Sequence, residues 1–311
     1  MFELLLPFFL LALLFLILTI VWRIKARKYI SSGTVASAYD AWTQDKLLER
    51  LWGEHIHLGF YPLGEKNIDF RNAKVQFVHE LVKWSGLDKL PKGSRILDVG
   101  CGIGGSSRIL AKYYGFNVTG ITISPAQVER ARELTPFDLN CRFQVMDALD
   151  LKFEDGSFDA VWSVEAGAHM NDKTKFADEM LRTLRPGGYL ALADWNSRDL
   201  IMNPPNLLER LVLKQLLEQW VHPNFISINE FDNILKTNKN SAGRVISENW
   251  NFYTNPSWYD SVIEGIRRPF AILSLGPFAI IKSIREIPTI ILMNWAFKRG
   301  LMEFGVYKCR G

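Results

Sequence analysis

An acid and a histidine stand four residues apart directly after an apolar run. Residues 158–164 have the pattern of a buried strand, and Glu165 and His169 follow it. Residues just past the carboxyl ends of parallel strands line the ligand crevice of an open sheet. A carboxylate and an imidazole in that place can exchange protons with a ligand near neutral pH. We therefore interpret Glu165 and His169 as candidate catalytic residues; a histidine that only packs is the alternative.

A glycine-rich turn provides a second kind of chemistry. An apolar run at 96–99 leads to a helix expected at 106–112, and between them lie Gly100, Gly102 and Gly105. Glycines let the backbone approach a ligand closely, and the helix N-terminus offers free N–H groups. The spacing matches the dinucleotide fingerprint, but a nicotinamide enzyme would carry an acid about 20 residues further on, where Thr122 stands. The turn therefore predicts a cofactor site and disfavours a nicotinamide cofactor.

These residues need a sheet to position them. Between 91 and 195, short apolar runs alternate with helical stretches, which predicts an α/β fold with a parallel sheet and helices on both faces. The strands expected in this part are 95–99, 117–123, 141–145, 158–164 and 188–195.

The flanking parts have other patterns. Residues 29–92 are helical in pattern and rich in aromatic and polar residues, and 198–245 read as helices with a polar linker. Two further strands are expected near 245–253 and 303–308. We divide the chain into an N-terminal segment at 1–28, a helical cap at 29–93, a cofactor-binding core at 94–197, and a helical lid with the final strands at 198–311.

Composition narrows the functional class. The chain has 311 residues, 48% apolar and 23% charged, which fits one folded enzyme domain with additions. The first 28 residues hold +3 of the net charge of +4, so no basic stripe for nucleic acid remains. The three cysteines are widely separated, which predicts a reducing compartment and no structural zinc, and no histidines or carboxylates have metal-ligand spacing.

The N-terminal segment has the character of a membrane anchor. Residues 4–22 carry no charge, and 19 residues of helix, at about 1.5 Å each, cross a hydrocarbon core of roughly 30 Å. A cleaved signal peptide is one alternative, but its basic residues would precede the apolar run, whereas here four of them follow it. An interfacial helix is another, but the run has no polar face. Because a basic flank stays in the cytoplasm, we expect one transmembrane helix with the catalytic part on the cytoplasmic side.

Further motifs accompany the glycine turn in a fixed order. Asp98 precedes it, Asp147 follows the third expected strand, and residues 184–190 lead into the fifth. This succession resembles the class I S-adenosylmethionine (SAM) methyltransferases, which implies a Rossmann-like sheet and SAM as the cofactor. The resemblance places SAM against Asp98, Gly100, Gly102 and Asp147.

The turn after the second expected strand narrows the resemblance. This sequence has Thr-x-Ser-x-x-Gln in place of an acid for the cofactor ribose, so Thr122 and Gln127 are implied there. Cyclopropane synthases and tocopherol methyltransferases share this departure. Ala168 stands where tocopherol methyltransferases tend to carry a second Glu. Nearly the whole chain resembles the cyanobacterial 2-methyl-6-phytyl-1,4-benzoquinol methyltransferase family, through residues 35–43, 52–59, 102–107, 163–170, 193–196 and 285–289.

The resemblance implies methylation of a ring carbon of a prenylated hydroquinone in tocopherol and prenylquinone biosynthesis, at a plasma or thylakoid membrane. Such a reaction needs a base near the phenol; His169 is the first candidate, assisted by Glu165, and His55 and His57 in the cap are rivals. Aromatic side chains would stabilise a sulfonium by cation–π contact. The candidates are Trp52, Trp195 and Tyr39, the last of which is also placed against the cofactor.

Two apolar stretches offer a place for the prenyl tail. Residues 269–281 and 287–293 are too short to cross a bilayer. Basic residues flank them, so they suit a lipid-facing surface or entrance in contact with the bilayer. Two ordinary core helices are the alternative.

Other functions stay open at this point. A gamma-tocopherol methyltransferase, or a cyclopropane-type or sterol-type enzyme acting on a membrane lipid, would use the same cofactor and differ in the mass of its product. A nicotinamide-dependent membrane oxidoreductase would bind NADH in place of SAM. A non-catalytic lipid-binding module would lose nothing on substitution of Glu165 and His169.

Overall fold

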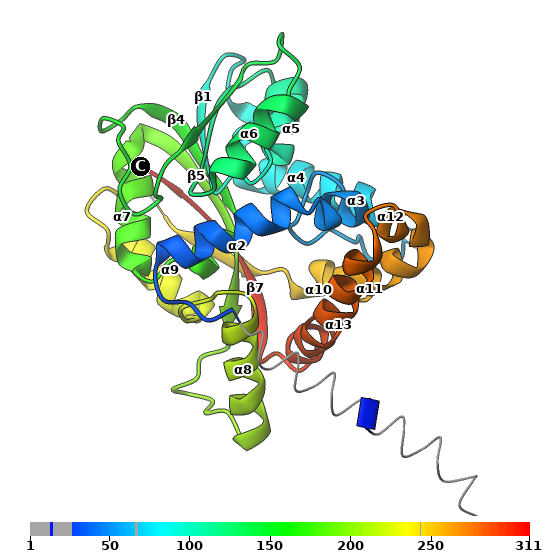
Figure 1. Cartoon of the computed structure of the whole chain (residues 1–311). Coiled ribbons are helices and arrows are strands. Elements are labelled where there is room, and N and C mark those ends of the chain that lie inside the picture. Colours follow the sequence, from blue (N-terminus) through cyan, green and yellow to red (C-terminus); the bar gives the residue numbers. More distant parts are fainter. Residues whose placement is uncertain (1–12, 15–26, 66–67, 243) are drawn as a thin grey trace, which may run out of the picture.

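A seven-stranded sheet forms the centre of the computed structural model, which describes residues 13–14, 27–65, 68–242 and 244–311. The strand order is β3-β2-β1-β4-β5-β7-β6 (Figure 1). Strands β1 to β5 are parallel, whereas β7 runs antiparallel to both β5 and β6. The strands are β1 (Arg95–Val99), β2 (Asn117–Thr122), β3 (Cys141–Val145), β4 (Phe158–Val164), β5 (Leu184–Ser197), β6 (Ile246–Asn249) and β7 (Met302–Arg310).

Helices cover both faces of this sheet. Helices α4 (Phe70–Ser85) and α5 (Gly105–Tyr114) pack on one face, and α7 (Lys173–Thr183) and α9 (Ile228–Thr237) pack on the other. The α/β class and the Rossmann-like sheet predicted from the sequence are therefore confirmed. The other helices are α2 (Ser32–Gln44), α3 (Leu47–Trp52), α6 (Pro125–Leu134), α8 (Leu207–Gln219), α10 (Asn251–Thr254), α11 (Pro256–Arg267), α12 (Pro269–Leu273), α13 (Pro277–Lys298) and the 3-10 turns η1 (Leu87–Lys89) and η2 (Gly167–His169).

Local sequence signals set several helix ends. The Asp69 side chain accepts the backbone N–H groups of Arg71 and Asn72 and so begins α4, which ends at Gly86 in the left-handed region. The Ser124 side chain in the same way accepts the N–H of Gln127 at the start of α6. This second cap fixes the turn after β2 at the edge of the sheet where ligands bind.

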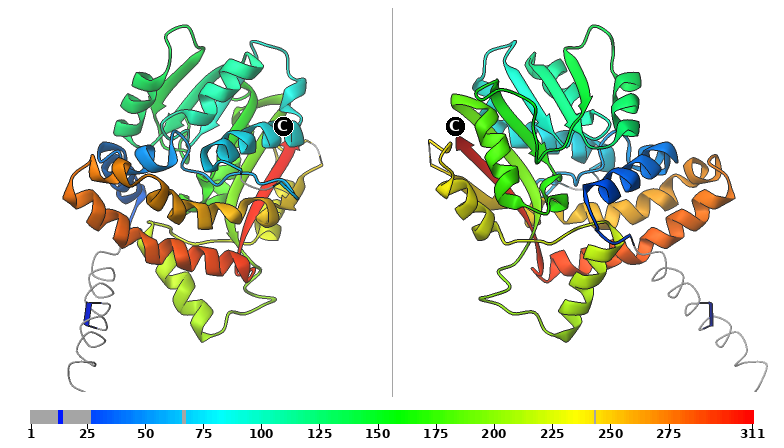
Figure 2. Two further views of the ribbon diagram at one scale, coloured as in Figure 1. Left: turned by 90° about the vertical axis from the view of Figure 1, so that its right-hand side faces the viewer. Right: turned by 60° about the vertical axis from the view of Figure 1, so that its left-hand side comes forward.

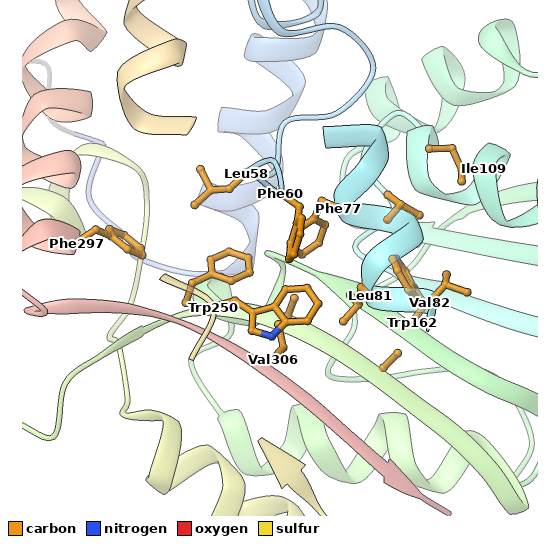
Figure 3. Close-up of a cluster of buried hydrophobic side chains, with 14 of the residues drawn as sticks. Leu58, Phe60, Phe77, Leu81, Val82, Ile109, Trp162, Trp250, Phe297 and Val306 are labelled. Carbon is orange, nitrogen blue, oxygen red and sulfur yellow. The ribbon is translucent and has the colours of Figure 1, made fainter. Parts of the chain in front are cut away.

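The main hydrophobic core lies between the sheet, α4 and the C-terminal helices. Phe77, Leu81 and Val82 of α4 pack toward Trp162 of β4 and Val306 of β7 (Figure 3). All five side chains are fully buried. Helix α4, which the sequence analysis counts with the cap, is therefore a layer of the sheet, whereas α2 and α3 lie at the carboxyl edge of the parallel strands (Figure 2).

Two expected strand boundaries differ by more than two residues from the observed ones. The strand expected near 245–253 ends at Asn249, because Trp250 enters the core and helix α10 begins at Asn251. Strand β5 begins at Leu184 rather than at 188, since Leu184 pairs with Phe158 through a register shift in β4.

The two apolar stretches of the C-terminal part have different environments. Every residue of α12 is exposed or partly exposed, and Phe278 near the start of α13 is 76% exposed. The second half of α13 is buried at Ile290, Met293 and Phe297. The helix continues through Pro288, so the two stretches are joined in α13. The surface interpretation therefore fits the first stretch, and the core interpretation fits the second.

The expected transmembrane helix at residues 4–22 lies outside the described residues, apart from positions 13 and 14. Within the described ranges, no helix combines the length and the apolar character that crossing a bilayer requires.

Candidate active site

A cavity of about 370 Å³ lies at the carboxyl edge of the parallel strands. This volume is within the range of about 300–1,000 Å³ that is usual for small-molecule sites. The cavity brings together all of the site residues that the sequence singles out: Tyr39, Trp52, His55, His57, Asp98, Gly100, Gly102, Thr122, Gln127, Asp147, Glu165, His169 and Trp195.

The glycine turn, residues 100–105, forms one part of the cavity wall. The N–H groups of Gly100 and Cys101 donate to the carbonyl of Ile121, which ties the turn to β2. A Cβ on Gly100 would lie 2.3 Å from the Cβ of Ala166, and its φ of +79° is in the left-handed region. A Cβ on Gly105 would lie 2.4 Å from the carbonyl oxygen of Glu54. Only glycine fits at either position.

Asp98 stands buried beside the turn. Its carboxylate accepts the Ser107 hydroxyl at 2.5 Å, and burial raises the pKa of Asp98 to about 7. It lines the cavity together with the glycine turn, so it can accept a hydrogen bond from the charged or polar end of a ligand.

The turn after β2 is internally bonded. The Thr122 hydroxyl donates to the side-chain oxygen of Gln127 at 2.6 Å, and both residues are buried. This bond leaves the Gln127 amide N–H groups for another acceptor. Asp147, two residues past β3, accepts the N–H of Leu149 and lines the same cavity. These residues are the ones that the resemblance assigns to the nucleoside part of SAM.

Helix α2 closes this side of the cavity. The Asp40 carboxylate accepts both the Ser124 hydroxyl at 2.5 Å and the N–H of Ala126 at 3.1 Å. An acid at a helix N-terminus is favoured by the helix dipole. Sequence analysis missed Asp40, since the only signal was an acid next to the aromatic residues of the cap. Its contact places Tyr39, the preceding residue, over the cavity.

Tyr39 and His169 are hydrogen-bonded to each other. The Tyr39 hydroxyl lies 2.8 Å from His169 Nε2, and His169 Nδ1 lies 3.2 Å from the carbonyl oxygen of Val221. Since a carbonyl only accepts, Nδ1 carries the hydrogen and Nε2 accepts from Tyr39. Burial lowers the pKa of His169 to about 4 and raises that of Tyr39 above its usual value. Both groups are neutral at pH 7.

Glu165 has different partners from those expected. Its carboxyl accepts the N–H of Leu58 at 2.7 Å, while the hydrogen bonds of His169 go to Tyr39 and Val221. Glu165 has a φ of +54°, an unusual value for a residue with a side chain, and such strain is often found at functional sites. Burial raises the pKa of Glu165 to about 8. Glu165 therefore lines the cavity, and it is not among the described residues that are hydrogen-bonded to His169.

The two cap histidines are bonded to each other. His55 Nδ1 and His57 Nε2 are 3.0 Å apart, and His57 Nδ1 donates to the carbonyl of Leu58. Lys74 donates to the carbonyl of His55 and lies over the Trp52 ring, 4.8 Å from its centroid. Burial lowers the pKa of Lys74 to about 7. Sequence analysis missed Lys74, because a lysine in an amphipathic helix usually faces water.

An aromatic chamber forms another part of the cavity, and it consists of His169, Trp195, Trp220, His222 and Trp258. The ring centroids of Trp195 and Trp258 are 5.4 Å apart, and those of Trp195 and His222 are also 5.4 Å apart. Sequence analysis found only His169 and Trp195 of this group. The others come from the loop after α8 and from α11, whose positions no local motif predicts.

Charged residues line the cavity near α13. Lys282, Arg285 and Glu286 of α13 belong to its wall. Lys282 pairs with Asp45 at 3.0 Å, and Glu286 pairs with Arg27. Arg27 and the residue that follows α2, Asp45, are thus tied to α13. In the described part of the chain, no cluster of three or more His, Cys, Asp or Glu residues could hold a metal ion.

Comparison with known proteins agrees with this geometry. A sequence model of the methyltransferase domain family matches residues 97–192, from β1 to β5. The chain is 53% identical to 2-methyl-6-phytyl-1,4-hydroquinone methyltransferase from Synechocystis sp., over 98% of this chain and 96% of that protein. It is 34% identical to the chloroplastic tocopherol O-methyltransferase of Arabidopsis thaliana, over 85% of this chain and 78% of the relative.

Solved structures share the fold. A cyclopropane synthase from Mycobacterium tuberculosis superposes with a TM-score of 0.73 at 16% identity, covering 89% of this chain and 97% of that one. Geranyl diphosphate C-methyltransferase from Streptomyces coelicolor, solved with S-adenosyl-L-homocysteine, gives 0.64 at 20% identity, covering 90% and 97%. From the full-length match and the site geometry, we conclude that the chain belongs to the SAM-dependent methyltransferases, in the family of the 2-methyl-6-phytyl-1,4-hydroquinone and tocopherol methyltransferases.

Proposed function

We propose that this enzyme methylates a ring carbon of a prenylated hydroquinone, with 2-methyl-6-phytyl-1,4-hydroquinone as the acceptor. One observation carries the proposal: a single cavity joins the cofactor turn to an aromatic chamber with buried hydroxyl, imidazole and carboxyl groups. The 53% identity to the Synechocystis enzyme over the whole chain supports this acceptor. In this proposal, residues 94–197 hold the cofactor, and the flanking cap and lid hold the acceptor.

The cavity residues fit SAM. Gly100 and Gly105 let the turn pack against Ala166 and Glu54. At Gly102 the nearest atom to a Cβ would be Gln127 Nε2 at 3.9 Å, so the backbone is open to a ligand there. Asp98, Gly102, Gln127 and Asp147 line the same space and would contact it, and Tyr39 with Trp52 would face the sulfonium. When bound, SAM supplies an electrophilic methyl group.

The remaining chemistry belongs to the acceptor. The bond from a ring carbon to the methyl group forms as the bond from sulfur to the methyl group breaks, and the ring carbon then loses its proton. A phenol hydroxyl hydrogen-bonded to a base makes the neighbouring ring carbon more nucleophilic. The Tyr39 hydroxyl donates to neutral His169, so its oxygen can still accept from the phenol, and His169 assists through Tyr39.

Lys74 and Glu165 adjust the charge around the ring. Both line the cavity, and burial moves the pKa of each toward neutrality, to about 7 and about 8. A lysine that is protonated during transfer would stabilise negative charge on a phenol oxygen. Precise placement of ring and methyl group also supplies much of the rate enhancement.

Methyl transfer from labelled SAM tests this function. Full-length protein in detergent is incubated with methyl-labelled SAM and 2-methyl-6-phytyl-1,4-hydroquinone, and the product is analysed by mass spectrometry. Label on a ring carbon is expected. Label on a hydroxyl oxygen, or transfer only to gamma-tocopherol or to a lipid alkene, would contradict the proposed acceptor chemistry. A wild-type protein that binds NADH and not SAM would contradict the cofactor as well.

We also propose that the prenyl tail enters from a lipid bilayer beside α12 and α13. Exposed apolar side chains gather on α11, α12 and the first half of α13, namely Ile266, Phe270, Leu273, Phe278, Ile281 and Ile284. Arg267 and Arg268 pair with Glu264, and Lys282 pairs with Asp45. The three cationic side chains are still 40–52% exposed, so they can also reach lipid phosphates. Lys282 also lines the cavity, so this surface adjoins the chamber. The proposed single-pass anchor at 4–22 would hold the same side of the protein at a plasma or thylakoid membrane.

Lipid labelling tests the bilayer contact. Full-length protein is placed in vesicles whose lipids carry a photoreactive acyl chain, and labelled peptides are identified after irradiation. Peptides from 266–284 should carry label. The peptide with Phe137, an exposed phenylalanine in the loop before β3, is the matched control and should not. Equal labelling of both peptides, or of neither, argues against this surface.

A further inference from the structure

Two histidines form a reciprocal pair in the aromatic chamber. The rings of His169 and His222 stack with centroids 4.3 Å apart and an interplanar angle of 20°. His169 Nδ1 lies 3.2 Å from the carbonyl oxygen of Val221, and His222 Nδ1 lies 3.4 Å from that of Ala168. Each ring is therefore anchored on the residue that precedes the other. Because carbonyl oxygens only accept, each Nδ1 carries a hydrogen and each Nε2 has a lone pair that can accept a hydrogen bond.

Among the described residues, only one of the two lone pairs has a hydrogen-bond donor. His169 Nε2 accepts the Tyr39 hydroxyl at 2.8 Å. His222 Nε2 has no hydrogen-bond partner among the described residues, although only 3% of His222 is exposed. A buried polar atom without a partner is unfavourable and uncommon in folded proteins. Since His222 lines the cavity, a ligand that donates a hydrogen bond would satisfy this nitrogen.

Backbone strain maintains the pair. Val221 has a φ of +61°, which is rare for a β-branched residue. Its N–H donates to the carbonyl of Arg27, and its own carbonyl holds His169. A strained backbone conformation is kept only where contacts with the surrounding structure hold it, and such residues are concentrated at functional sites. The strained residue directs its carbonyl to one ring and places the next residue, His222, against the same ring.

We infer that His222 Nε2 accepts the hydrogen bond of a ring hydroxyl of the aromatic acceptor, and that it thereby selects the ring carbon that receives the methyl group. This inference rests on the proposed function. Burial and the neighbouring His169 hold the pKa of His222 well below its usual value, so the lone pair stays free at neutral pH. The hydroxyl proton remains shared with Nε2 during transfer. After the new carbon–carbon bond forms, the ring carbon releases its own proton to water.

Substitution of His222 tests the inference through the acceptor. His222→Phe keeps an aromatic ring but removes Nε2, and we expect kcat/KM for the hydroquinone to fall by about 10²-fold. Affinity for S-adenosylhomocysteine should stay at the wild-type level, because His222 contacts Ala168 and the rings of His169, Trp195 and Phe225, none of which belongs to the glycine turn. His222→Gln places an amide oxygen near the position of Nε2 and should recover most of the loss. His79→Phe, at a histidine that bonds Tyr114 outside the cavity, is the matched control.

A spectroscopic readout separates substrate contact from a packing role. In protein with ¹⁵N-labelled histidine, the Nε2 signal of His222 should shift when 2-methyl-6-phytyl-1,4-hydroquinone is added with S-adenosylhomocysteine. The dimethyl ether of the same compound has no hydroxyl and should leave the signal unchanged. If the wild-type protein methylates the hydroquinone but the Nε2 signal does not shift, the role of His222 is overturned and the proposed function is not. The same holds if the His222→Phe variant keeps the kcat/KM of the wild-type protein. A wild-type protein that neither binds nor methylates the hydroquinone overturns both this role and the proposed function.

Discussion

The two parts of the cavity are built in different ways. The part that we propose for the cofactor is formed by the ends of consecutive strands and the turns that follow them, and Asp98, Gly100 and Asp147 lie within 50 residues of sequence. The aromatic chamber draws His169 from η2, Trp195 from β5, His222 from the loop after α8 and Trp258 from α11, and Tyr39 of the cap bonds to it. A cofactor that is common to many enzymes needs only the sheet edge, whereas acceptor specificity needs side chains from elements that differ between enzymes.

This difference predicts that the cofactor part tolerates the least change. Gly100→Val adds a side chain where even a Cβ would lie 2.3 Å from Ala166, so turnover should fall by about 10²-fold or more with loss of SAM binding. Gly187→Val is the matched control, since Gly187 also has a positive φ but a Cβ there would have no neighbouring atom within 4 Å. Calorimetric binding of S-adenosylhomocysteine measures both. If the Gly100→Val variant bound S-adenosylhomocysteine as the wild-type protein does, the cofactor part would not be less tolerant of change than the chamber.

The chamber should instead lose acceptor turnover while it keeps the cofactor. Tyr39→Phe removes the hydroxyl that His169 Nε2 accepts. The unpartnered imidazole should cost about 1.4 kcal/mol, or about tenfold in kcat for the hydroquinone. Tyr113→Phe, at an exposed tyrosine on α5, should have wild-type kinetics. Steady-state assays with each substrate varied check this; a loss confined to the KM for SAM would place Tyr39 with the cofactor part only.

A buried carboxyl group of the cavity, that of Glu165, also predicts a pH effect on stability. Burial raises the pKa of Glu165 to about 8, whereas the unfolded chain ionises near the usual value of 4.5. Between pH 4.5 and about 8, Glu165 is protonated in the folded state and ionised in the unfolded state. Its contribution to the free energy of unfolding is therefore fully present below pH 4.5 and is lost as the pH rises through about 8. Glu165→Gln should therefore flatten the decline in the free energy of unfolding between about pH 5 and 8.

Urea unfolding at several pH values measures this effect. Glu65→Gln, at an exposed residue outside the cavity, provides the control and should keep the wild-type pH slope. Identical slopes for wild type and the Glu165 variant would show that Glu165 ionises normally in the folded protein.

The smallest effect is expected at the charged rim beside α13. Lys282 forms an ion pair with Asp45 at 3.0 Å, and exposed pairs of this kind contribute about 0–1 kcal/mol. Lys282→Met should change kcat/KM for the phytyl substrate by no more than about threefold. Lys298→Met at the other end of α13 should have no effect. A loss as large as that of Tyr39→Phe would mean that the rim, and not the chamber, controls access of the acceptor.

The sequence alone determined the cofactor part. The strands that end at Val99, Thr122 and Val145 were predicted within one residue, because apolar runs and turn residues are local signals. Since parallel strands end at one edge, their following turns had to meet there, and the predicted Asp98, Gly102 and Asp147 do line one cavity.

Only the tertiary structure decided the chamber. His222 and Trp258 of the chamber lie far from any motif, as does Lys74 elsewhere in the cavity, and long-range packing brings all three to the cavity. The hydrogen-bond partners of His169 could not be predicted from the sequence either. Glu165 is only four residues from His169 but accepts from Leu58. Tyr39 is 130 residues from His169 and is hydrogen-bonded to it. Spacing along the chain predicts which residues share an edge of a sheet. It does not predict which donor meets which acceptor, because that depends on backbone conformations such as the positive φ of Val221 and on helices that fold over the site from elsewhere.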